Sequence, residues 1–301
     1  MSLVEQAISR MRRSGGEAPP KSAPGDPGAA PKAMVTAPLP ESVSERASSA
    51  RRMTIDLNSL RAGGYLPEEA KDRQFAEHYR QIKRPLIAKA LANEAAAPTD
   101  PRVIMVTSAL PGDGKTFTST NLAFSLARER DISVLLVDAD LPKPHVSRIF
   151  GLQKEPGLMD ALVDESIAIE SLVVTTNVRG LSILPAGNPA EGIAELLHSD
   201  RMRQMTARLC GHDPRRIVLL DSPPLLVTSE GPALTSLAGQ VVLVVRAGQT
   251  PSRAVVDSVS LIGAGRLGGI VLNEAPAQAT AGYYYGYGSY GTYGDAPSPK
   301  S

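Results

Sequence analysis

The stretch that decides the fold runs from Arg102 to Thr120 and reads Arg-Val-Ile-Met-Val-Thr-Ser-Ala-Leu-Pro-Gly-Asp-Gly-Lys-Thr-Phe-Thr-Ser-Thr. A short apolar run, Val103–Val106, leads into a loop that ends in Gly114–Thr116, and an alanine- and leucine-bearing segment follows. This order predicts a strand, a loop and a helix. Backbone N–H groups of such a loop, together with the start of the helix, form a positive concavity that suits phosphate.

Two side chains of this loop give it a chemical role. Lys115 is expected to reach the terminal phosphates of a nucleotide, and the Thr116 hydroxyl is expected to ligate Mg²⁺. The usual pattern is Gly-x-x-x-x-Gly-Lys-Ser/Thr, and Ala109 stands where its first glycine would be. A chance Gly-Lys-Thr in a loop is the alternative, which the acidic strand ends described below argue against.

Composition limits the class of protein. A chain of 301 residues with 42% hydrophobic residues can build one large domain or two small ones. The formal net charge of +1 gives no indication of nucleic-acid binding. The single cysteine, Cys210, excludes an intrachain disulfide and fits a reducing cytoplasm. No apolar run approaches the roughly 20 residues of a membrane span, so we expect a soluble chain whose membrane role depends on a partner.

Both ends of the chain differ from its middle. Residues 1–13 are expected to form a short amphipathic helix, either a frayed terminus or a docking helix for a partner. Residues 14–52 are rich in Pro, Gly and Ala and are expected to be a disordered linker. At the other end, six of the eight tyrosines lie among glycines between 283 and 293. The sequence therefore predicts a flexible Tyr/Gly-rich tail over 279–301, with a low-complexity sticky tail as the alternative.

The segment 53–100 is expected to be mainly helical. Met53–Leu60 reads as a short extended piece, and Pro67 is placed to start a helix that runs to about Ala92. Pro85 would kink this helix. Three charged residues are spaced to share one face of it, and spacing alone favours a solvated face with local ion pairs: Glu77, Arg80 and Lys83.

From residue 101 to about 278 the pattern alternates strands and helices. Runs that are apolar at every position suit a parallel sheet covered on both faces, and they occur at Val103–Val106, Val134–Val137, Ile217–Leu220, Val241–Val245 and Ile270–Leu272, with a weaker run at Leu181–Leu184. Helical patterns at about 118–129, 193–210 and 252–263 supply the crossovers. The sequence thus predicts an α/β domain with a doubly wound, mainly parallel sheet, whose ligands bind at the carboxyl ends of its strands.

Polar side chains stand at those strand ends. Asp138 and Asp140 follow one buried strand, and Asp221 follows another. Buried carboxylates require a cation or hydrogen-bond donors, and Mg²⁺ bound to nucleotide phosphates is a natural partner. One of the first two could approach Mg²⁺ or the nucleophile while the other braces the loop; N-caps of following helices are the alternative. Asn273 follows the last strand and either reads a base edge or makes a turn.

At this point the residues carry a resemblance. The chain resembles the bacterial tyrosine autokinases (BY-kinases) of exopolysaccharide export, a branch of P-loop NTPases related to the MinD/ParA partition ATPases. The resemblance covers about 70–280, and the Met1–Ala7 start and the Glu77–Pro85 segment are similar to the stand-alone cytoplasmic kinases of exosortase-associated loci.

The resemblance assigns roles to particular residues. Asp221 lies in the Walker B motif, Asp138 and Asp140 lie in Walker A′, and Asn273 lies at the adenine. The basic residue usual two positions after the second aspartate is replaced by Pro142, so that either Lys143 or Arg148 serves in its place. The nucleotide contacts implied for Walker A are Pro111, Gly112, Asp113, Gly114, Lys115, Thr116 and Phe117.

The implied activity is phosphoryl transfer from ATP to tyrosine in trans, with Mg²⁺ bound by Thr116, Asp138 and Asp221. Lys115 would stabilise the transferring phosphoryl group, and Asp138 would accept the phenol proton. Together with Asp140 they form the expected catalytic residues. The expected phosphoacceptors are Tyr283, Tyr284, Tyr285, Tyr287, Tyr290 and Tyr293.

The resemblance also implies partners. Glu77, Arg80 and Lys83 match a ring-assembly motif, so a ring-like homo-oligomer is expected. A transmembrane polysaccharide co-polymerase would recruit the cytoplasmic chain to the inner face of the membrane, and a tyrosine phosphatase would reverse the modification. Two other classes stay open. The first is a MinD/ParA-like positioning ATPase, but those proteins have an extra lysine where this chain has Leu110, which argues against it. The second is a non-catalytic ATP-binding regulator of a membrane partner.

Overall fold

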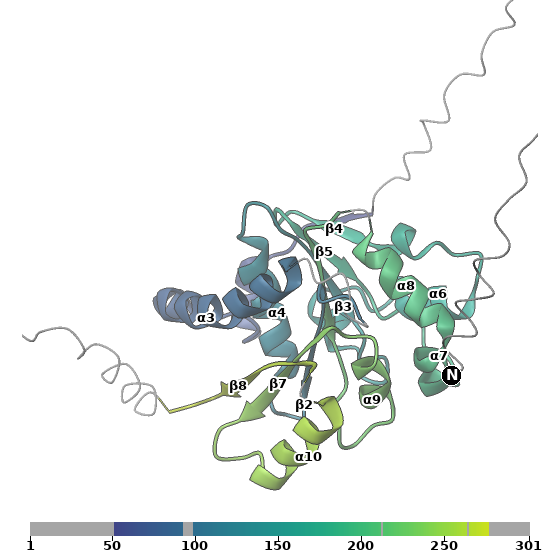
Figure 1. The fold of residues 1–301 in the computed structure, drawn as a ribbon. Helices are drawn as coiled ribbons and strands as arrows, with labels where there is room; N and C mark the ends of the chain where they lie inside the picture. The colour runs from purple at the N-terminus through teal and green to yellow at the C-terminus, as the bar shows by residue number, and fades with distance from the viewer. Residues whose placement is uncertain (1–50, 93–98, 212, 264, 277–301) are drawn as a thin grey trace, which may run out of the picture. The chain divides into compact units, whose positions relative to one another are not determined.

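The computed structural model describes residues 51–92, 99–211, 213–263 and 265–276. Within them an eight-stranded sheet has the order β1-β4-β5-β3-β6-β2-β7-β8 (Figure 1). Its strands are β1 (Arg52–Met53), β2 (Val103–Ser108), β3 (Ser133–Asp138), β4 (Val174–Thr176), β5 (Leu181–Leu184), β6 (Arg216–Asp221), β7 (Gln240–Arg246) and β8 (Leu267–Asn273).

All neighbouring strands run parallel except β4 and β5, which pair antiparallel. A parallel neighbour requires a crossover connection, and helices supply it on both faces of the sheet. The predicted α/β class with a doubly wound, mainly parallel sheet is therefore confirmed. The strand β4 has no counterpart among the predicted runs because three residues are too few to show a pattern.

Helices divide into two layers, with α3 and α4 on one face of the sheet and α6 to α10 on the other (Figure 1). Two short 3₁₀ turns, Glu69–Lys71 and Ile169–Leu172, add to them. The α-helices are α2 (Leu57–Ala62), α3 (Asp72–Leu91), α4 (Lys115–Ala127), α5 (His145–Ile149), α6 (Leu158–Val163), α7 (Ile193–His198), α8 (Asp200–Cys210), α9 (Glu230–Thr235) and α10 (Ser252–Ile262).

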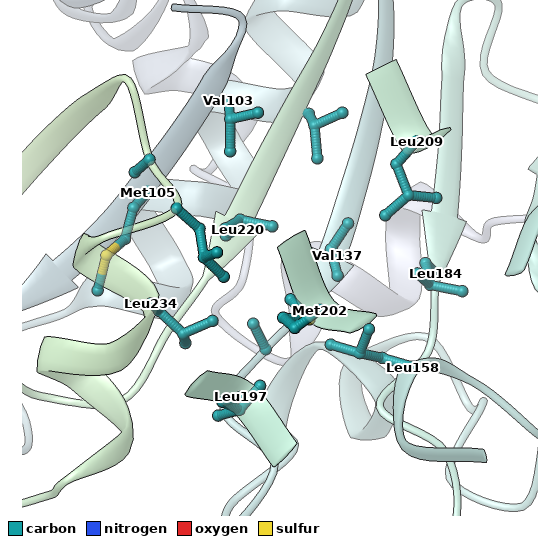
Figure 2. Packing of buried hydrophobic residues seen from close by; sticks show 14 of the residues in the cluster. Val103, Met105, Val137, Leu158, Leu184, Leu197, Met202, Leu209, Leu220 and Leu234 are labelled. Carbon is teal, nitrogen blue, oxygen red and sulfur yellow. The ribbon is translucent and has the colours of Figure 1, made fainter. Parts of the chain in front are cut away.

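The central strands contribute side chains to both apolar layers, which explains why the predicted runs are apolar at every position. Val103 and Met105 of β2 belong to the layer under α6 to α9, whereas Ile104 and Val106 belong to the layer under α3 and α4. Figure 2 shows the first layer, where strand residues meet helix residues; its labelled members are Val103, Met105, Val137, Leu158, Leu184, Leu197, Met202, Leu209, Leu220 and Leu234.

The N-terminal part differs from the sequence prediction in three ways. The extended piece is limited to β1, since the residues from Leu57 form α2, which Asp56 caps by accepting hydrogen bonds from two backbone N–H groups. The long helix begins at Asp72 rather than at Pro67, and Pro85 does not end it. The linker boundary at 52 is also wrong, because Arg52 pairs with Thr175 in the sheet.

The predicted helix 193–210 is two helices. It breaks at Ser199, whose backbone is extended with φ −68° and ψ 157° and whose hydroxyl accepts a hydrogen bond from the Met202 N–H. Ser199 thus caps α8. The break arises because the serine side chain hydrogen-bonds to the backbone, and the apolar periodicity of the segment does not show such a bond.

Several predictions fall outside the described residues. These are the helix 1–13, the linker as far as residue 50, and the tyrosines of the tail. Among the residues that the structure describes, no helix combines the length and hydropathy needed to cross a membrane.

Candidate active site

The loop between β2 and α4 has the backbone that phosphate binding requires. Gly112 and Gly114 have φ values of +89° and +96°, a region that favours glycine. At Gly114 a Cβ atom would also lie 2.0 Å from Asn273 Nδ2, so a larger residue would have to displace the Asn273 side chain. The helix α4 begins at Lys115, directly after this turn. The predicted order of strand, loop and helix start is confirmed.

The loop opens onto a cleft of about 660 Å³, a size that suits a nucleotide. Its walls come from the ends of β2, β3 and β6, as the carboxyl-end rule for parallel sheets predicts. The lining residues are Pro111, Gly112, Gly114, Lys115, Thr116, Phe117, Asp140, Pro142, Lys143, His145, Pro224, Val227 and Thr228.

Lys115 is held inside this cleft by a carboxylate. Its Nζ lies 2.6 Å from Asp140 Oδ2, and both side chains are nearly buried. Burial lowers the pKa of Lys115, but the nearby charges of Asp221 and Asp140 outweigh burial and raise the pKa above its ordinary value. The lysine is therefore a cation over the whole neutral range, and Asp140 is its partner in this structure.

Asp221, at the end of β6, accepts hydrogen bonds from two hydroxyls of α4. Thr116 Oγ1 lies 2.8 Å from one carboxylate oxygen, and Ser119 Oγ lies 2.9 Å from the other. Burial raises the pKa of Asp221 although Lys115 and both hydroxyls oppose it. Since the next helix, α9, begins only at Glu230, the helix-cap alternative does not apply to this aspartate.

Asp138 is fully buried and has one oxygen without a partner. Its Oδ2 accepts hydrogen bonds of 2.7 Å from the N–H and the hydroxyl of Ser147, near the start of α5, so a helix-capping contribution is present here. Its Oδ1 has no partner within the described structure. Burial, together with the charge of Asp221, raises the pKa of Asp138 to about 7, against the hydrogen bonds from Ser147.

The oxygen donors in this cleft fit Mg²⁺. Thr116 supplies a hydroxyl, Asp221 a carboxylate and Asp138 an unpartnered carboxylate oxygen, which are the hard ligands that Mg²⁺ prefers. Among the described residues, no group of three or more His, Cys, Asp or Glu could hold a metal ion by itself. Mg²⁺ would therefore be held jointly by these residues, nucleotide phosphates and water, as is usual for this ion.

The raised pKa of Asp138 predicts a pH-dependent stability in the absence of nucleotide. The folded-state pKa is about 7 and the ordinary value is 3.8. The protonated carboxyl therefore contributes stability that is fully present below about pH 4 and is lost as pH rises through about 7. The shift sets a ceiling of about 4 kcal/mol. Between pH 5 and pH 7.5, urea unfolding should show Asp138→Asn gaining stability relative to the wild type.

Asp257→Asn, at a partly exposed carboxylate on α10, is the control and should track the wild type across the same range. Parallel curves for the wild type and Asp138→Asn would show that Asp138 stays ionised in the folded protein and would contradict the assignment.

Contacts from the carboxyl ends of β7 and β8 brace the loop. Asp113 is buried, and its carboxylate accepts hydrogen bonds from the Leu110 N–H at 3.2 Å and from Thr250 Oγ1 at 2.7 Å. Asn273 donates from Nδ2 to the Asp113 carbonyl at 3.0 Å. Asn273 thus contacts the loop backbone in this structure, and Asp113 positions the loop rather than lining the cleft. The predicted adenine contact of Asn273 stays a prediction.

The two candidates for the missing basic residue of Walker A′ lie in different places. Lys143 is exposed and lines the cleft beside Pro142, whereas Arg148 is exposed on α5 and does not line it. This geometry favours Lys143.

The three residues expected at a ring interface do not share one solvent-exposed face. Arg80 pairs with Glu77 on the surface of α3. Lys83 is buried against α4, where its Nζ donates to the Ser125 carbonyl at 2.7 Å and lies 2.8 Å from Glu129. Glu77 and Lys83 are six residues apart, so on a helix they lie about 120° apart around the axis. The predicted shared face is therefore wrong: of the three residues, only Glu77 and Arg80 lie at the surface of α3.

Three polar residues of the site were missed from the sequence. Thr250 follows the end of β7, so the rule that ligands bind at carboxyl ends of strands could have indicated it. Ser119, one turn into α4 from Thr116, could have been found from helical spacing. Ser147 gives no such signal, because its contact with Asp138 depends on how α5 folds back across β3.

The sequence of this chain is similar to those of known proteins. Residues 101–257, just over half of the chain, match the AAA domain family. The tyrosine-protein kinase YwqD of Bacillus subtilis (strain 168) is 33% identical over 187 residues, which are 61% of this chain and 77% of YwqD. The tyrosine-protein kinase etk of Escherichia coli (strain K12) is 32% identical over 189 residues, which are 62% of this chain and only 26% of etk.

Solved structures agree with these relatives. The VpsO kinase domain superposes with a TM-score of 0.56 at 30% identity, covering 69% of this chain and 100% of that domain. The BceF tyrosine kinase domain superposes with a TM-score of 0.58 at 29% identity, covering 73% of this chain and 87% of that domain. The chain belongs to the bacterial tyrosine-protein kinases, enzymes built on a P-loop domain of the AAA family.

Proposed function

We propose that this kinase phosphorylates its own C-terminal tyrosines between copies and thereby regulates exopolysaccharide polymerisation and export. The observation that carries the proposal is Asp138, a buried carboxylate with an unpartnered oxygen and a pKa near 7, next to the phosphate loop. A base poised near the working pH suits removal of a phenol proton. The acceptors are Tyr283, Tyr284, Tyr285, Tyr287, Tyr290 and Tyr293.

The step is a direct displacement. The tyrosine oxygen bonds to the γ-phosphorus of ATP as the bond to the ADP oxygen breaks, and the phenol proton passes to Asp138. Mg²⁺, when bound, neutralises phosphate charge. Lys115 has to exchange Asp140 for phosphate oxygens, and Asp140 is then free to face the cleft it already lines. Because Asp138 is fully buried beside this pair, we propose that the same exchange gives the substrate access to it.

The tyrosines of the described part are poor acceptors. Tyr79 is buried in α3, and burial raises the pKa of its phenol. Tyr65 is half-buried where the chain leaves α2. The remaining six of the eight tyrosines are those of the tail, which supports the tail as the substrate.

Phosphorylation in trans can be tested with two inactive halves. Kinase A carries Lys115→Met with an intact tail, and kinase B is truncated after Ala281 with an intact site. Neither should label alone, whereas the mixture with Mg·ATP should accumulate phosphotyrosine on A, because B supplies the site and A the acceptors. Anti-phosphotyrosine blotting distinguishes the two chains by size. No labelling of A in the mixture, while the wild type labels itself, would show that transfer occurs within one chain.

We propose that Glu77 and Arg80 join copies into a ring-like assembly. Both are on the open side of α3, where a neighbour could replace their mutual ion pair. Arg80→Glu puts two acidic residues side by side and should shift the assembly to smaller species in light scattering. Arg179→Glu, at an exposed arginine between β4 and β5 and not on α3, is the control. An unchanged mass for Arg80→Glu would leave this pair as an ordinary surface contact.

Lys83 enters the same proposal differently. Its buried contact with α4 supports a role in setting the angle of α3, on which Glu77 and Arg80 are displayed, rather than in touching a neighbour.

Further elements of the proposal rest on the family. A solved chimerical protein, CapA2B2, superposes with a TM-score of 0.59 at 25% identity over 74% of this chain. We propose that this chain works beside a transmembrane polysaccharide co-polymerase, in the cytoplasm at the inner face of the membrane, and that a tyrosine phosphatase resets it. The stand-alone type of exosortase-associated loci stays a prediction from the sequence.

A further inference from the structure

The free edge of the sheet forms a groove with α3. Strand β8 is the last strand in the sheet order, so one side of its backbone has no strand partner among the described residues. A cavity of about 540 Å³ follows the whole stretch Gly268–Ala275. Its other wall comes from α3, including Gln74, His78 and Pro85. We call this cavity the edge groove. An edge strand beside a helix is an arrangement that accepts an extended peptide as an added strand.

Apolar side chains along β8 are left uncovered. Ile270 is 50% exposed and Leu272 is 57% exposed. Both pair with core residues of β7, Leu243 and Val245, and so point to the face that α10 covers. Because α10 packs on β7, it leaves these two side chains of the edge strand in water. An added strand would bury them on one face and fill the edge groove on the other.

The path of the chain favours one occupant. Glu274 has a φ of +55°, a left-handed conformation that turns the chain at the end of β8. An ion pair between Arg246 and Glu274, 2.7 Å long, fixes this exit. Ala275 already lines the edge groove. A segment that begins three residues later, at residue 278, is held at high effective concentration, which a separate partner does not have.

We propose that residues 278–287 of the tail dock in the edge groove as an added antiparallel strand in the same copy. Tyrosine is a strand former and packs its ring on apolar surface while keeping its hydroxyl in water. This span holds Tyr283, Tyr284, Tyr285 and Tyr287, and leaves Tyr290 and Tyr293 outside it.

Docking would shield the first four tyrosines from a kinase site. Phosphorylation adds about −1.5 to −2 charges per tyrosine and would release the docked tail. This release rests on the proposed function, whereas the docking itself does not. The surface also differs from the displayed pair Glu77 and Arg80, so docking and assembly use different faces of α3.

Hydrogen exchange without nucleotide tests the docking and requires no kinase activity. The full chain and a chain that ends at Ala277 are compared over 268–273. We expect exchange there to be at least about tenfold faster in the shortened chain, since its edge amides have lost a partner. A peptide of residues 278–293 added to the shortened chain should restore protection. The same peptide phosphorylated on Tyr283, Tyr284 and Tyr285 should not.

Two surface variants of the full chain sharpen the result. Ile270→Lys should expose 268–273 as truncation does, whereas Val256→Lys, at a residue 59% exposed on α10, should exchange like the wild type. Equal exchange in full and shortened chains would overturn the proposal. Protection that disappears on dilution, together with a fall in mass, would overturn it in favour of a second copy as the occupant. Lys115→Met, which removes kinase activity, should leave the exchange pattern unchanged.

Discussion

Purified Lys115→Met protein incubated with Mg·ATP is expected to show no phosphotyrosine above background, a loss of about 10³-fold or more. Lys115 is the buried cation of the cleft, and the nearby carboxylates keep it charged. Methionine keeps the length of the side chain but removes the charge that stabilises the transferring phosphoryl group. The measurement is an anti-phosphotyrosine blot over time, with ADP release measured in parallel.

Two controls separate chemistry from folding. Lys154→Met, at an exposed lysine remote from the cleft, should label like the wild type. Because Lys115→Met leaves Asp140 buried without its cation, thermal unfolding must show that the variant is folded. A folded Lys115→Met protein with unchanged labelling would refute the kinase mechanism at this loop.

Truncation after Ala281 is the second change with a large expected effect: it should remove nearly all incorporated phosphate while leaving the catalytic domain folded. The two tyrosines that remain are Tyr65, which is half-buried, and Tyr79, which is buried. Neither can reach another site without local unfolding, which requires free energy. Incorporated phosphate is measured with labelled ATP.

The matched control is a chain that ends at Asp295. It loses part of the tail but keeps all six tail tyrosines, so its phosphate incorporation should equal that of the full chain. Labelling at Tyr65 or Tyr79 that persists after truncation at Ala281 would place the acceptors in the folded domain.

The central fold could be predicted because its determinants are local and periodic. Residues such as Val103 and Ile104 are both apolar since each faces a different helix layer, and this marks a buried parallel strand. The loop ending at Thr116 carries its own chemistry in its sequence. These signals identified the α/β class and the phosphate loop.

The errors arise where long-range contacts outweigh local pattern. Lys83 has the spacing of a surface residue, yet it is buried against α4, where it contacts the Ser125 carbonyl and Glu129, just beyond the end of α4. Pro67 fits a first-turn position, but the helix begins only at Asp72, and the Pro67 carbonyl accepts a hydrogen bond from Arg61 at 2.6 Å. The contact of Lys83 joins residues 42 positions apart, and no local window of sequence contains both of them.

The active site shows the same division. The sequence placed Asp138, Asp140 and Asp221 at strand ends, and the structure brings them around Lys115 and Thr116. Their division of roles was open, because it depends on contacts such as Ser147 to Asp138 and Lys115 to Asp140. The brace from Thr250 to Asp113 joins residues 137 positions apart and shows only in the folded chain.

Phosphosite mapping by mass spectrometry on the wild type and Lys115→Met, side by side after incubation with Mg·ATP, tests the central claim most directly. We expect phosphate in the wild type on the tyrosines between 283 and 293 and none on any tyrosine of Lys115→Met. Equal phosphate in both proteins, or ATP turnover by the wild type with no phosphotyrosine, would contradict a tyrosine autokinase and indicate an ATPase that transfers phosphate to water.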